Sequence, residues 1–243
     1  MVSGLAVKRQ VQWPQTYRII RSIHPPIDLF EDIADPRDWE ALASVEEKTN
    51  PRIRFEIGDL GKVPADRRVA GHGASYVMAP FVHCSTQRPG RFSDGSYGIY
   101  YAADRENVAV AETIHHHEKF MRATNEEPGW TSDFRALIGS VDRELDDVSK
   151  VPDVLDPVDY TASHVEGREL RAQGSHGLLW PSVRMRGGFC IGIFWPNVIT
   201  IPVQGRHYSY HWNGARVDFV RQYDTGTVLE VKASPVTVET GLA

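Results

Sequence analysis

Long apolar runs and a surplus of positive charge are both missing from this chain of 243 residues. No apolar stretch approaches the roughly 20 residues that a membrane-spanning helix needs, so we expect no association with a membrane. The opening, MVSGLAVKRQVQW, places its basic residues after a short apolar patch, which is the reverse of a signal peptide. The sequence therefore predicts a cytoplasmic protein.

Cysteine is scarce, and the net charge has the wrong sign for a duplex-binding protein. Cys84 and Cys190 stand far apart and outside any C-x-x-C pattern, so two reduced thiols are expected rather than a disulfide framework. The formal net charge is -5, whereas a surface that binds nucleic acid usually needs a basic excess. We expect no direct nucleic-acid binding.

Glycine-rich phosphate-binding motifs are absent as well. Neither G-x-G-x-x-G after a strand nor G-x-x-x-x-G-K-[ST] occurs, so the Rossmann and P-loop folds have no support. Hydrophobic residues make up 41% of the chain, which suffices for a core without a metal or disulfide. We expect a largely helical N-terminal extension over 1–74, a core over 75–233 and a tail over 234–243.

Strand patterns outnumber helical ones, and they gather late in the chain. Helices are predicted over 37–48 behind Asp35-Pro36, over 104–123, and over 161–172 with Gly174 as the end signal. Asn213-Gly214 between two alternating runs predicts a hairpin. The predicted strands are 75–83, 98–103, 134–142, 177–180, 189–195, 199–203, 207–212, 216–220 and 227–232. This order predicts an α+β fold with a strand-rich core.

Glu112 stands at a boundary of the helix predicted over 104–123. It lies about 40° around the helix from Val108, at the edge of the apolar face. A carboxylate there is either solvated or turned toward a cleft, and full burial would require a partner such as Arg, Tyr or Ser. Spacing alone favours the solvated alternative, because glutamate is usually exposed.

Three histidines, His115, His116 and His117, follow in the same helix. Consecutive helical residues point about 100° apart, so the three cannot bind one metal ion. Neither H-x-x-x-H nor H-E-x-x-H occurs. We interpret these histidines as surface and packing residues, at most one of which lines a pocket, and we expect no metal.

Arg91 and Ser182 are two further polar candidates. Arg91 belongs to a glycine-containing loop and could hold a phosphate through its planar fork; the alternative is an ordinary surface arginine. Ser182 follows Pro181 between two apolar strands, without the G-x-S-x-G context of a nucleophile. The alternative for Ser182 is a turn serine that satisfies backbone groups.

Taken together, these positions resemble the RES-domain family, which is named after an Arg, a Glu and a Ser. The resemblance covers about residues 80–205 and is carried by PGRFSDGSYGIYYAA, VAVAETIHHHEKF and GSHGLLWPSVR. Tyr17-Arg18 also resembles the family's opening Y-R. Phe92 and Ser93 depart from the Trp and Asn that often follow the family's Gly-Arg, which leaves the subfamily and the acceptor open.

The resemblance implies a fold similar to the ADP-ribosyltransferases, with split sheets around an NAD cleft. It implies the toxin of a bacterial type II toxin–antitoxin pair, with NAD+ as the substrate cleaved at the nicotinamide–ribose bond by hydrolysis or phosphorolysis. An Xre-like helix-turn-helix antitoxin would block the cleft. The alternatives are a mono-ADP-ribosyltransferase that modifies a host protein and a non-catalytic module that binds NAD or a partner. A homo-oligomer is also possible.

The same resemblance assigns the site residues. Glu112 would stabilise the oxocarbenium-like state, and Ser182 would position nicotinamide or ribose. Arg91 would hold the pyrophosphate or an incoming phosphate. Tyr101 would face nicotinamide; strand alternation turns Tyr100 the other way, and Tyr101 is preferred for its spacing to Glu112. The residues expected to bind substrate in addition are Arg18, Tyr17 and Phe92.

Overall fold

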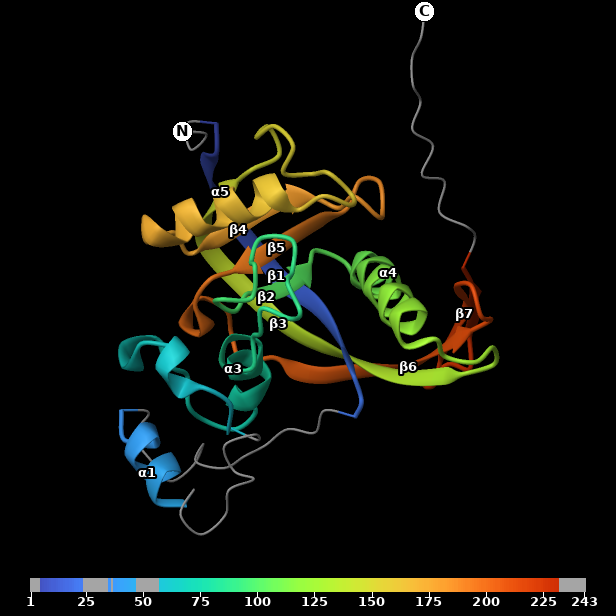
Figure 1. Cartoon of the computed structure of the whole chain (residues 1–243), viewed down its shortest axis with the longest axis horizontal. Helices are drawn as coiled ribbons and strands as arrows, with labels where there is room; N and C mark the ends of the chain where they lie inside the picture. The colour runs from blue at the N-terminus through green and yellow to red at the C-terminus, as the bar shows by residue number, and fades with distance from the viewer. Residues whose placement is uncertain (1–4, 24–34, 36, 47–56, 232–243) are drawn as a thin grey trace, which may run out of the picture.

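The computed structural model describes residues 5–23, 35, 37–46 and 57–231. Within them, eight strands hydrogen-bond in the order β1-β2-β5-β4-β3-β6-β7-β8, and β1 also pairs with β3. The strands β1, β2, β5, β4 and β3 therefore close a ring of pairings, from which β6, β7 and β8 extend (Figure 1).

Strands and helices of the described residues are unequal in length. The strands are β1 Val7–Arg21, β2 Tyr100–Ala103, β3 Thr131–Asp147, β4 Gly177–Pro181, β5 Phe189–Ile193, β6 Val203–Trp212, β7 Val217–Gln222 and β8 Val228–Glu230. The helices are α1 Trp39–Glu46, α3 Ala74–Val82, α4 Glu106–Thr124 and α5 Thr161–Ala172, with the short 3-10 turns η1 Leu60–Lys62, η2 Ala65–Arg67 and η3 Pro196–Val198. The predicted α+β class is confirmed.

The N-terminal segment departs most from the prediction. Instead of belonging to a largely helical extension, Val7–Arg21 forms β1, which pairs antiparallel with β3 over nearly its whole length. The register shifts between Trp13 and Thr16, and Pro14 lies in that irregularity, where a missing N–H costs no ladder bond. A helical extension is therefore wrong for these residues, because their strand partner lies far along the chain.

Two other strand predictions are wrong. Residues 75–83 fall mostly in helix α3, whose buried Val77, Met78, Phe81 and Val82 follow a helical spacing. A short apolar run of this kind does not distinguish strand from helix by itself. Residues 199–202 are irregular, and β6 begins only after Pro202, which cannot donate to a ladder.

The remaining predicted elements appear close to their expected places. Helix α5 has the predicted bounds, and Gly174 beyond it has a φ of 83°. The hairpin β6–β7 turns at Asn213-Gly214, where Gly214 has a φ of 96°. The predicted tail over 234–243 and the helix end at Asn50-Pro51 lie outside the described residues.

Two hydrophobic clusters cover the two sides of the strands. One contains Val108 of α4 and Leu170 of α5, and the other contains Val77, Met78, Phe81 and Val82 of α3. Neighbouring strand residues divide between them, so Tyr100 belongs to the α3 side and Tyr101 packs on the α4 side. In the described part, no helix combines the length and apolarity needed to cross a membrane.

Candidate active site

Glu112 of α4 meets Ser182, which follows β4 directly. The Ser182 hydroxyl donates to Glu112 Oε1 at 2.6 Å and accepts the backbone N–H groups of Arg184 at 3.1 Å and Met185 at 3.0 Å. A hydroxyl has one proton, so the two N–H groups direct that proton at the carboxylate. Ser182 therefore satisfies backbone N–H groups of its turn, as expected of a turn serine, and also holds the Glu112 carboxylate.

A second neutral group, the thiol of Cys190, lies beside Glu112. The Cys190 thiol lies 3.7 Å from Glu112 Oε1, and burial together with Glu112 raises its pKa, which keeps the thiol protonated. No ion pair of Glu112 exists among the described residues, and its Oε2 has no hydrogen-bond partner there. The solvated alternative is thus replaced by a half-buried carboxylate held by neutral donors.

Arg91 is buried, not an ordinary surface arginine. Its Nη1 donates to the carbonyl oxygens of Val154 at 3.1 Å and Asp156 at 2.6 Å. Its guanidinium lies 4.5 Å from the ring centroid of Tyr160. Burial lowers the pKa of Arg91, while the negative charge of Glu112 acts to raise it.

Tyr101 holds the Arg91 loop in place. Its hydroxyl accepts the N–H of Phe92 at 3.1 Å, and its ring meets Trp180 edge-on at 6.2 Å. A Cβ on Gly90 would lie 2.8 Å from this hydroxyl, so glycine is needed there. Burial raises the pKa of Tyr101, which therefore stays a neutral phenol.

Phe92 is a core residue, and the expectation that its side chain binds substrate is wrong. The side chain is fully buried and packs on Trp180 at a ring distance of 4.7 Å. On its other side, the Phe92 carbonyl approaches Gly167 of α5 so closely that a Cβ there would lie 2.3 Å from the oxygen. Phe92 thereby anchors the loop that carries Arg91.

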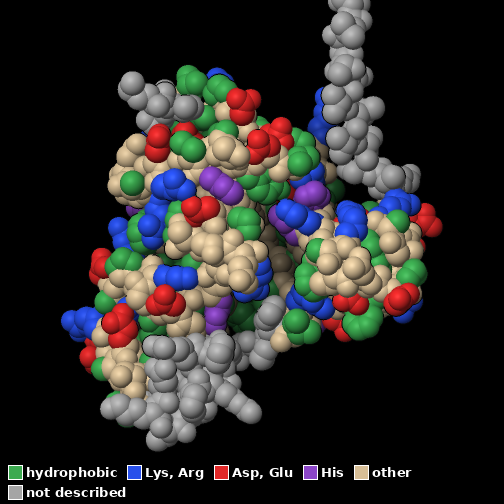
Figure 2. Space-filling model, viewed as in Figure 1, with side chains coloured by type: hydrophobic (Ala, Val, Ile, Leu, Met, Phe, Trp, Pro, Cys, Tyr) green, Lys and Arg blue, Asp and Glu red, His purple; other side chains and the backbone are tan. Residues whose placement is uncertain are grey.

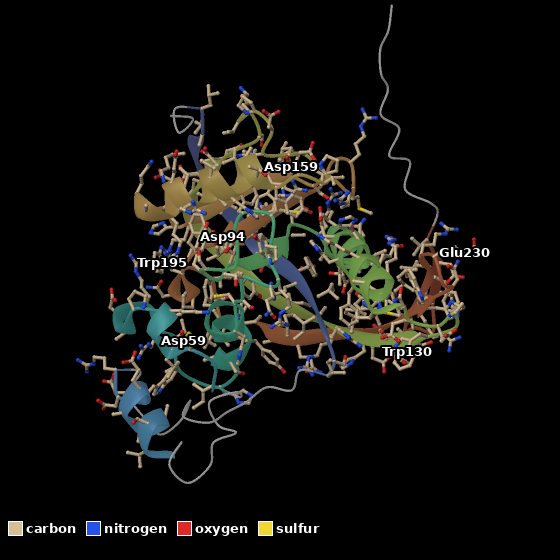
Figure 3. The ribbon with its side chains drawn as sticks, in the orientation of Figure 1. Asp59, Asp94, Trp130, Asp159, Trp195 and Glu230 are labelled. Carbon is tan, nitrogen blue, oxygen red and sulfur yellow. The ribbon has the colours of Figure 1, made fainter. Side chains whose placement is uncertain are left out.

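Helix α5 supports the same loop from outside. His164 Nε2 lies 2.8 Å from the Gly90 carbonyl, and Arg168 donates to Asp94 at 2.7 Å. Figure 3 labels Asp94 in the loop below α5 and Asp159 at the start of that helix, where Asp159 accepts the N–H of Thr161 at 2.8 Å. Helix α5 therefore holds the Arg91 loop through His164 and Arg168.

The three histidines point to three environments. His117 is buried beside Phe134, with ring centroids 5.0 Å apart, which confirms a packing role. His116 is exposed, yet desolvation, Arg184 and Arg91 lower its pKa while Glu112 acts to raise it. His116 follows Glu112 by four residues in α4, so the two lie one helical turn apart on the same face, a signal that was available in the sequence. Among the described residues, no three His, Cys, Asp or Glu side chains gather around a possible metal ion.

Arg184 and His115 were not among the predicted site residues. Arg184 Nη2 lies 2.9 Å from His115 Nε2 and donates to the carbonyl of Pro157 at 2.6 Å. The motif W-P-S-V-R contained Arg184, but only the fold turns it toward α4. Figure 2 shows a hollow beside the lobe of α4 and β7, with basic side chains along its upper rim.

Arg18 holds β1 to β2 at the point where these strands diverge. It donates to the Tyr101 carbonyl at 3.0 Å, and its guanidinium lies 4.9 Å from the centroid of Tyr100. Strand alternation turns it to the side of Tyr100, away from the ring of Tyr101. No hydrogen bond or ion pair joins it to Glu112 or Ser182 in the described part.

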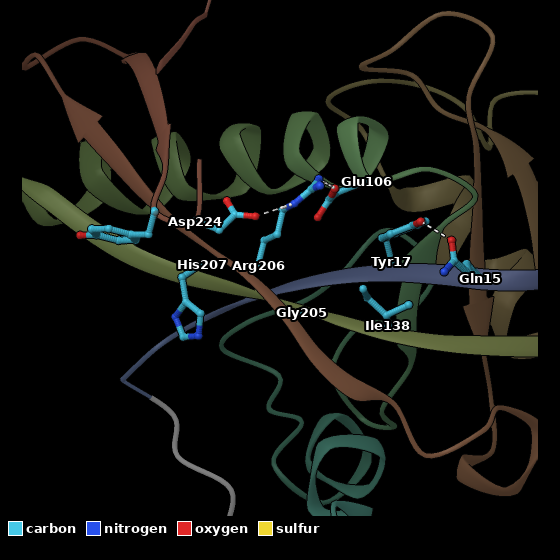
Figure 4. A pocket seen from close by; sticks show the side chains of 9 residues that line it. Gln15, Tyr17, Glu106, Ile138, Gly205, Arg206, His207 and Asp224 are labelled. Atoms are coloured by element: carbon cyan, nitrogen blue, oxygen red, sulfur yellow. Dashed lines mark hydrogen bonds and ion pairs between the residues drawn. The ribbon is translucent and has the colours of Figure 1, made fainter. Parts of the chain in front are cut away.

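Tyr17 lines a different hollow. Its hydroxyl donates to Gln15 at 2.7 Å (Figure 4). The hollow has a volume of about 820 Å³ and is lined by Gln15, Tyr17, Glu106, Ile138, Gly205, Arg206, His207, Tyr223 and Asp224. None of Arg91, Tyr101, Glu112 and Ser182 lines it, so the structure does not bring Tyr17 into their group.

Comparison with known proteins bears on this arrangement. A sequence model of the RES domain matches residues 66–213, which is more than half of the chain. The chain belongs to the RES family. This RES protein is similar along most of its length to "Uncharacterized protein y4oC" of Sinorhizobium fredii (strain NBRC 101917 / NGR234). It is 29% identical over 211 residues, which cover 86% of this chain and 87% of that protein.

Among solved structures, the chain is similar to one titled "Crystal structure of the M.tuberculosis MbcT-MbcA toxin-antitoxin complex". The match covers 86% of this chain and 88% of the matched one, at 12% identity and a TM-score of 0.39.

Proposed function

We propose that this RES protein cleaves NAD+ at the nicotinamide–ribose bond and acts as the toxin of a bacterial toxin–antitoxin pair. The observation that carries the proposal is Glu112, a half-buried carboxylate that Ser182 orients and that has no ion-pair partner among the described residues. Membership of the RES family supports the assignment, because the family resemblance implies this activity and a Xre-like antitoxin that covers the cleft.

The chemistry explains why such a carboxylate is useful. When nicotinamide leaves, positive charge develops on the ribose carbon and ring oxygen, as in glycoside cleavage. A preorganised negative charge stabilises that state, and more strongly where water is partly excluded. A cation paired with Glu112 would cancel this effect. The Oε2 atom of Glu112, which has no hydrogen-bond partner within the described residues, is suited to bind a ribose hydroxyl or the incoming nucleophile.

Arg91 and Tyr101 fit the rest of the substrate. The guanidinium of Arg91 suits the diphosphate of NAD+, and the half-buried ring of Tyr101 offers a flat surface for nicotinamide. Water as the acceptor would give nicotinamide and ADP-ribose with release of a proton. Inorganic phosphate would give nicotinamide and ADP-ribose carrying that phosphate on the same ribose carbon.

Mass spectrometry of NAD+ incubated with the purified chain, with and without phosphate, tests the proposal. We expect free nicotinamide and one of the two ADP-ribose products. Glu112→Gln should reduce turnover by about 10²–10³-fold, because the charge but not the shape is lost. Glu118→Gln is the matched control on the same helix, since Glu118 is already bound by Arg122 and by the N–H of Val217.

Three outcomes are informative. Equal NAD+ in samples of wild type, Glu112→Gln and no protein would reject NAD+ cleavage. Labelled NAD+ that marks a protein band in a lysate, without free ADP-ribose, would replace cleavage by mono-ADP-ribosyl transfer. Growth arrest on expression of wild type but not Glu112→Gln would support the toxin role.

A further inference from the structure

We propose that Arg184 is a second anion-binding residue, which forms with Arg91 a two-arginine subsite for the diphosphate of a dinucleotide, and that His115 positions it. The identity of the dinucleotide rests on the proposed function. The anion site itself rests on the contacts of Arg91 and Arg184.

Both arginines are anchored by one loop. Arg91 donates to the carbonyls of Val154 and Asp156, and Arg184 donates to the carbonyl of Pro157. These acceptors are neutral, so they orient the guanidinium groups without cancelling their charge. Neither arginine has a carboxylate partner in an ion pair within the described residues.

The shared loop brings the two cations to one place, because Arg91 donates to the carbonyl of Asp156 and Arg184 to that of the next residue, Pro157. In keeping with this, Arg184 adds to the effect of burial in lowering the pKa of Arg91, while Glu112 acts to raise it. Backbone hydrogen bonds and, to a smaller extent, Arg91 lower the pKa of the exposed Asp156. Neither arginine lies in an ion pair within the described residues, and a diphosphate, with its two charged groups, would supply a partner for both.

Arg184 retains unused donor capacity. Its Nη2 makes both side-chain hydrogen bonds, so its Nη1 has none within the described part. A phosphate oxygen is an acceptor that suits the remaining N–H groups of a planar guanidinium fork.

His115 sets the direction of the Arg184 side chain. A guanidinium can only donate, so His115 Nε2 must accept the hydrogen bond and carry no proton. Burial and the charge of Arg184 lower the pKa of His115 to about 4, so the imidazole remains a neutral acceptor at physiological pH. His115 is therefore a positioning residue that needs no contact with the ligand.

Calorimetric binding of ADP-ribose, adenosine and inorganic pyrophosphate to the full chain tests the subsite. We expect Arg184→Gln to weaken ADP-ribose and pyrophosphate binding at least about tenfold, as for a lost charge-assisted contact, and to leave adenosine unchanged. Arg184→Lys should lose less, because charge is kept but the fork is not. Arg186→Gln removes the same charge from an exposed neighbour and should change none of the three affinities.

His115 variants give an independent readout. His115→Gln keeps an oxygen that can accept from Arg184 and should retain affinity for ADP-ribose, whereas His115→Leu should resemble Arg184→Gln. In turnover of NAD+, we expect Arg184→Gln and His115→Leu to raise KM more than they lower kcat. A merely structural role would lower activity in His115→Gln and His115→Leu alike.

The inference is overturned if folded Arg184→Gln binds ADP-ribose and pyrophosphate as wild type does, or if wild type binds neither. It is also overturned if Arg186→Gln has the same effect as Arg184→Gln. Failure of the proposed function is distinguishable, since absent NAD+ cleavage with Arg184-dependent binding of ADP-ribose would reject the reaction and keep the anion site.

Discussion

Two hollows lie beside helix α4, and their charges are arranged in opposite ways. In the hollow of Figure 4, Arg206 donates to Glu106 at 2.7 Å and to Asp224 at 3.0 Å. The Tyr208 hydroxyl also donates to Glu106. Arg206 thus lies in an ion pair with both carboxylates, so each charged group named here has a partner of opposite sign within the protein.

The cleft around Glu112 differs in this respect. Glu112 receives a hydroxyl from Ser182, while Arg91 and Arg184 are held by carbonyl oxygens and a histidine nitrogen. Hydrogen bonds orient the charged groups in both places, but of these groups only Glu112, Arg91 and Arg184 lack an ion pair within the described residues. A helix can thus carry one glutamate that stabilises the fold and another that is available for a substrate.

The largest expected contrast is between Ser182→Ala and Tyr208→Phe, each of which removes one hydroxyl donor to a glutamate of α4. Ser182→Ala should lower kcat for NAD+ about 10–100-fold, since a hydrogen bond to a charged group contributes about 1.5–3 kcal/mol. Tyr208→Phe should leave kcat within about twofold and lower the free energy of unfolding by about 1–2 kcal/mol. Steady-state kinetics and urea unfolding measure both, and equal losses of kcat would abolish the contrast.

Gly167→Ala tests whether the cleft depends on the close contact between α5 and the Arg91 loop. The added Cβ would meet the Phe92 carbonyl at 2.3 Å, so we expect the free energy of unfolding to fall by about 1–3 kcal/mol. The KM for NAD+ should rise with it, because the loop carries Arg91. Val165→Ala, at an exposed position of the same helix, is the control. A stabilising Gly167→Ala, as helix propensity alone would give, would contradict the contact.

His117→Phe tests a titrating group outside both hollows. Burial lowers the pKa of folded His117 from 6.5 to about 4, so the unfolded chain binds the proton first as the pH falls. The contribution of neutral His117 to the free energy of unfolding is complete above about pH 6.5 and is lost as the pH falls toward 4. Between pH 7 and pH 5, the free energy of unfolding drops by roughly 2 kcal/mol for this reason. His117→Phe should remove this part of the pH dependence of urea unfolding. Met121→Leu, a buried neighbour without a proton, should leave it unchanged.

Arg206→Gln should have the smallest effect. Arg206 is half exposed, and exposed ion pairs contribute little to stability. We expect a small loss in the urea midpoint and an unchanged rate of NAD+ cleavage. If Arg206→Gln lowered NAD+ turnover as strongly as Arg184→Gln, the hollow of Figure 4 would belong to the active site.

The sequence predicted correctly those helices and turns whose signals lie within a few neighbouring residues. The helices α4 and α5 and the hairpin at Asn213-Gly214 combine a repeating apolar face with an end or turn signal in the same few residues. The strand β1 lacks such a signal because its stabilising partner β3 comes much later in the chain. The helix α3 was misassigned because its short apolar run fits both periods.

Some residues of the candidate site were identified from the sequence, and others were found only in the structure. Arg91, Tyr101, Glu112 and Ser182 were identified through the family resemblance, whereas spacing alone favoured a solvated Glu112. Phe92 was misassigned because the sequence does not say that its side chain faces Trp180. Arg184 and His115 were missed because their contact joins residues that only folding brings together.

The sequence by itself determined the α+β class, the residue types of the site and the helix that carries Glu112. Only the tertiary structure decided which charges are compensated. Glu106 and Glu112 lie on one helix with the same chemistry, but Arg206 reaches only the first. Compensation depends on distances between side chains of different elements, and such distances arise when the chain packs, not from the order of its residues.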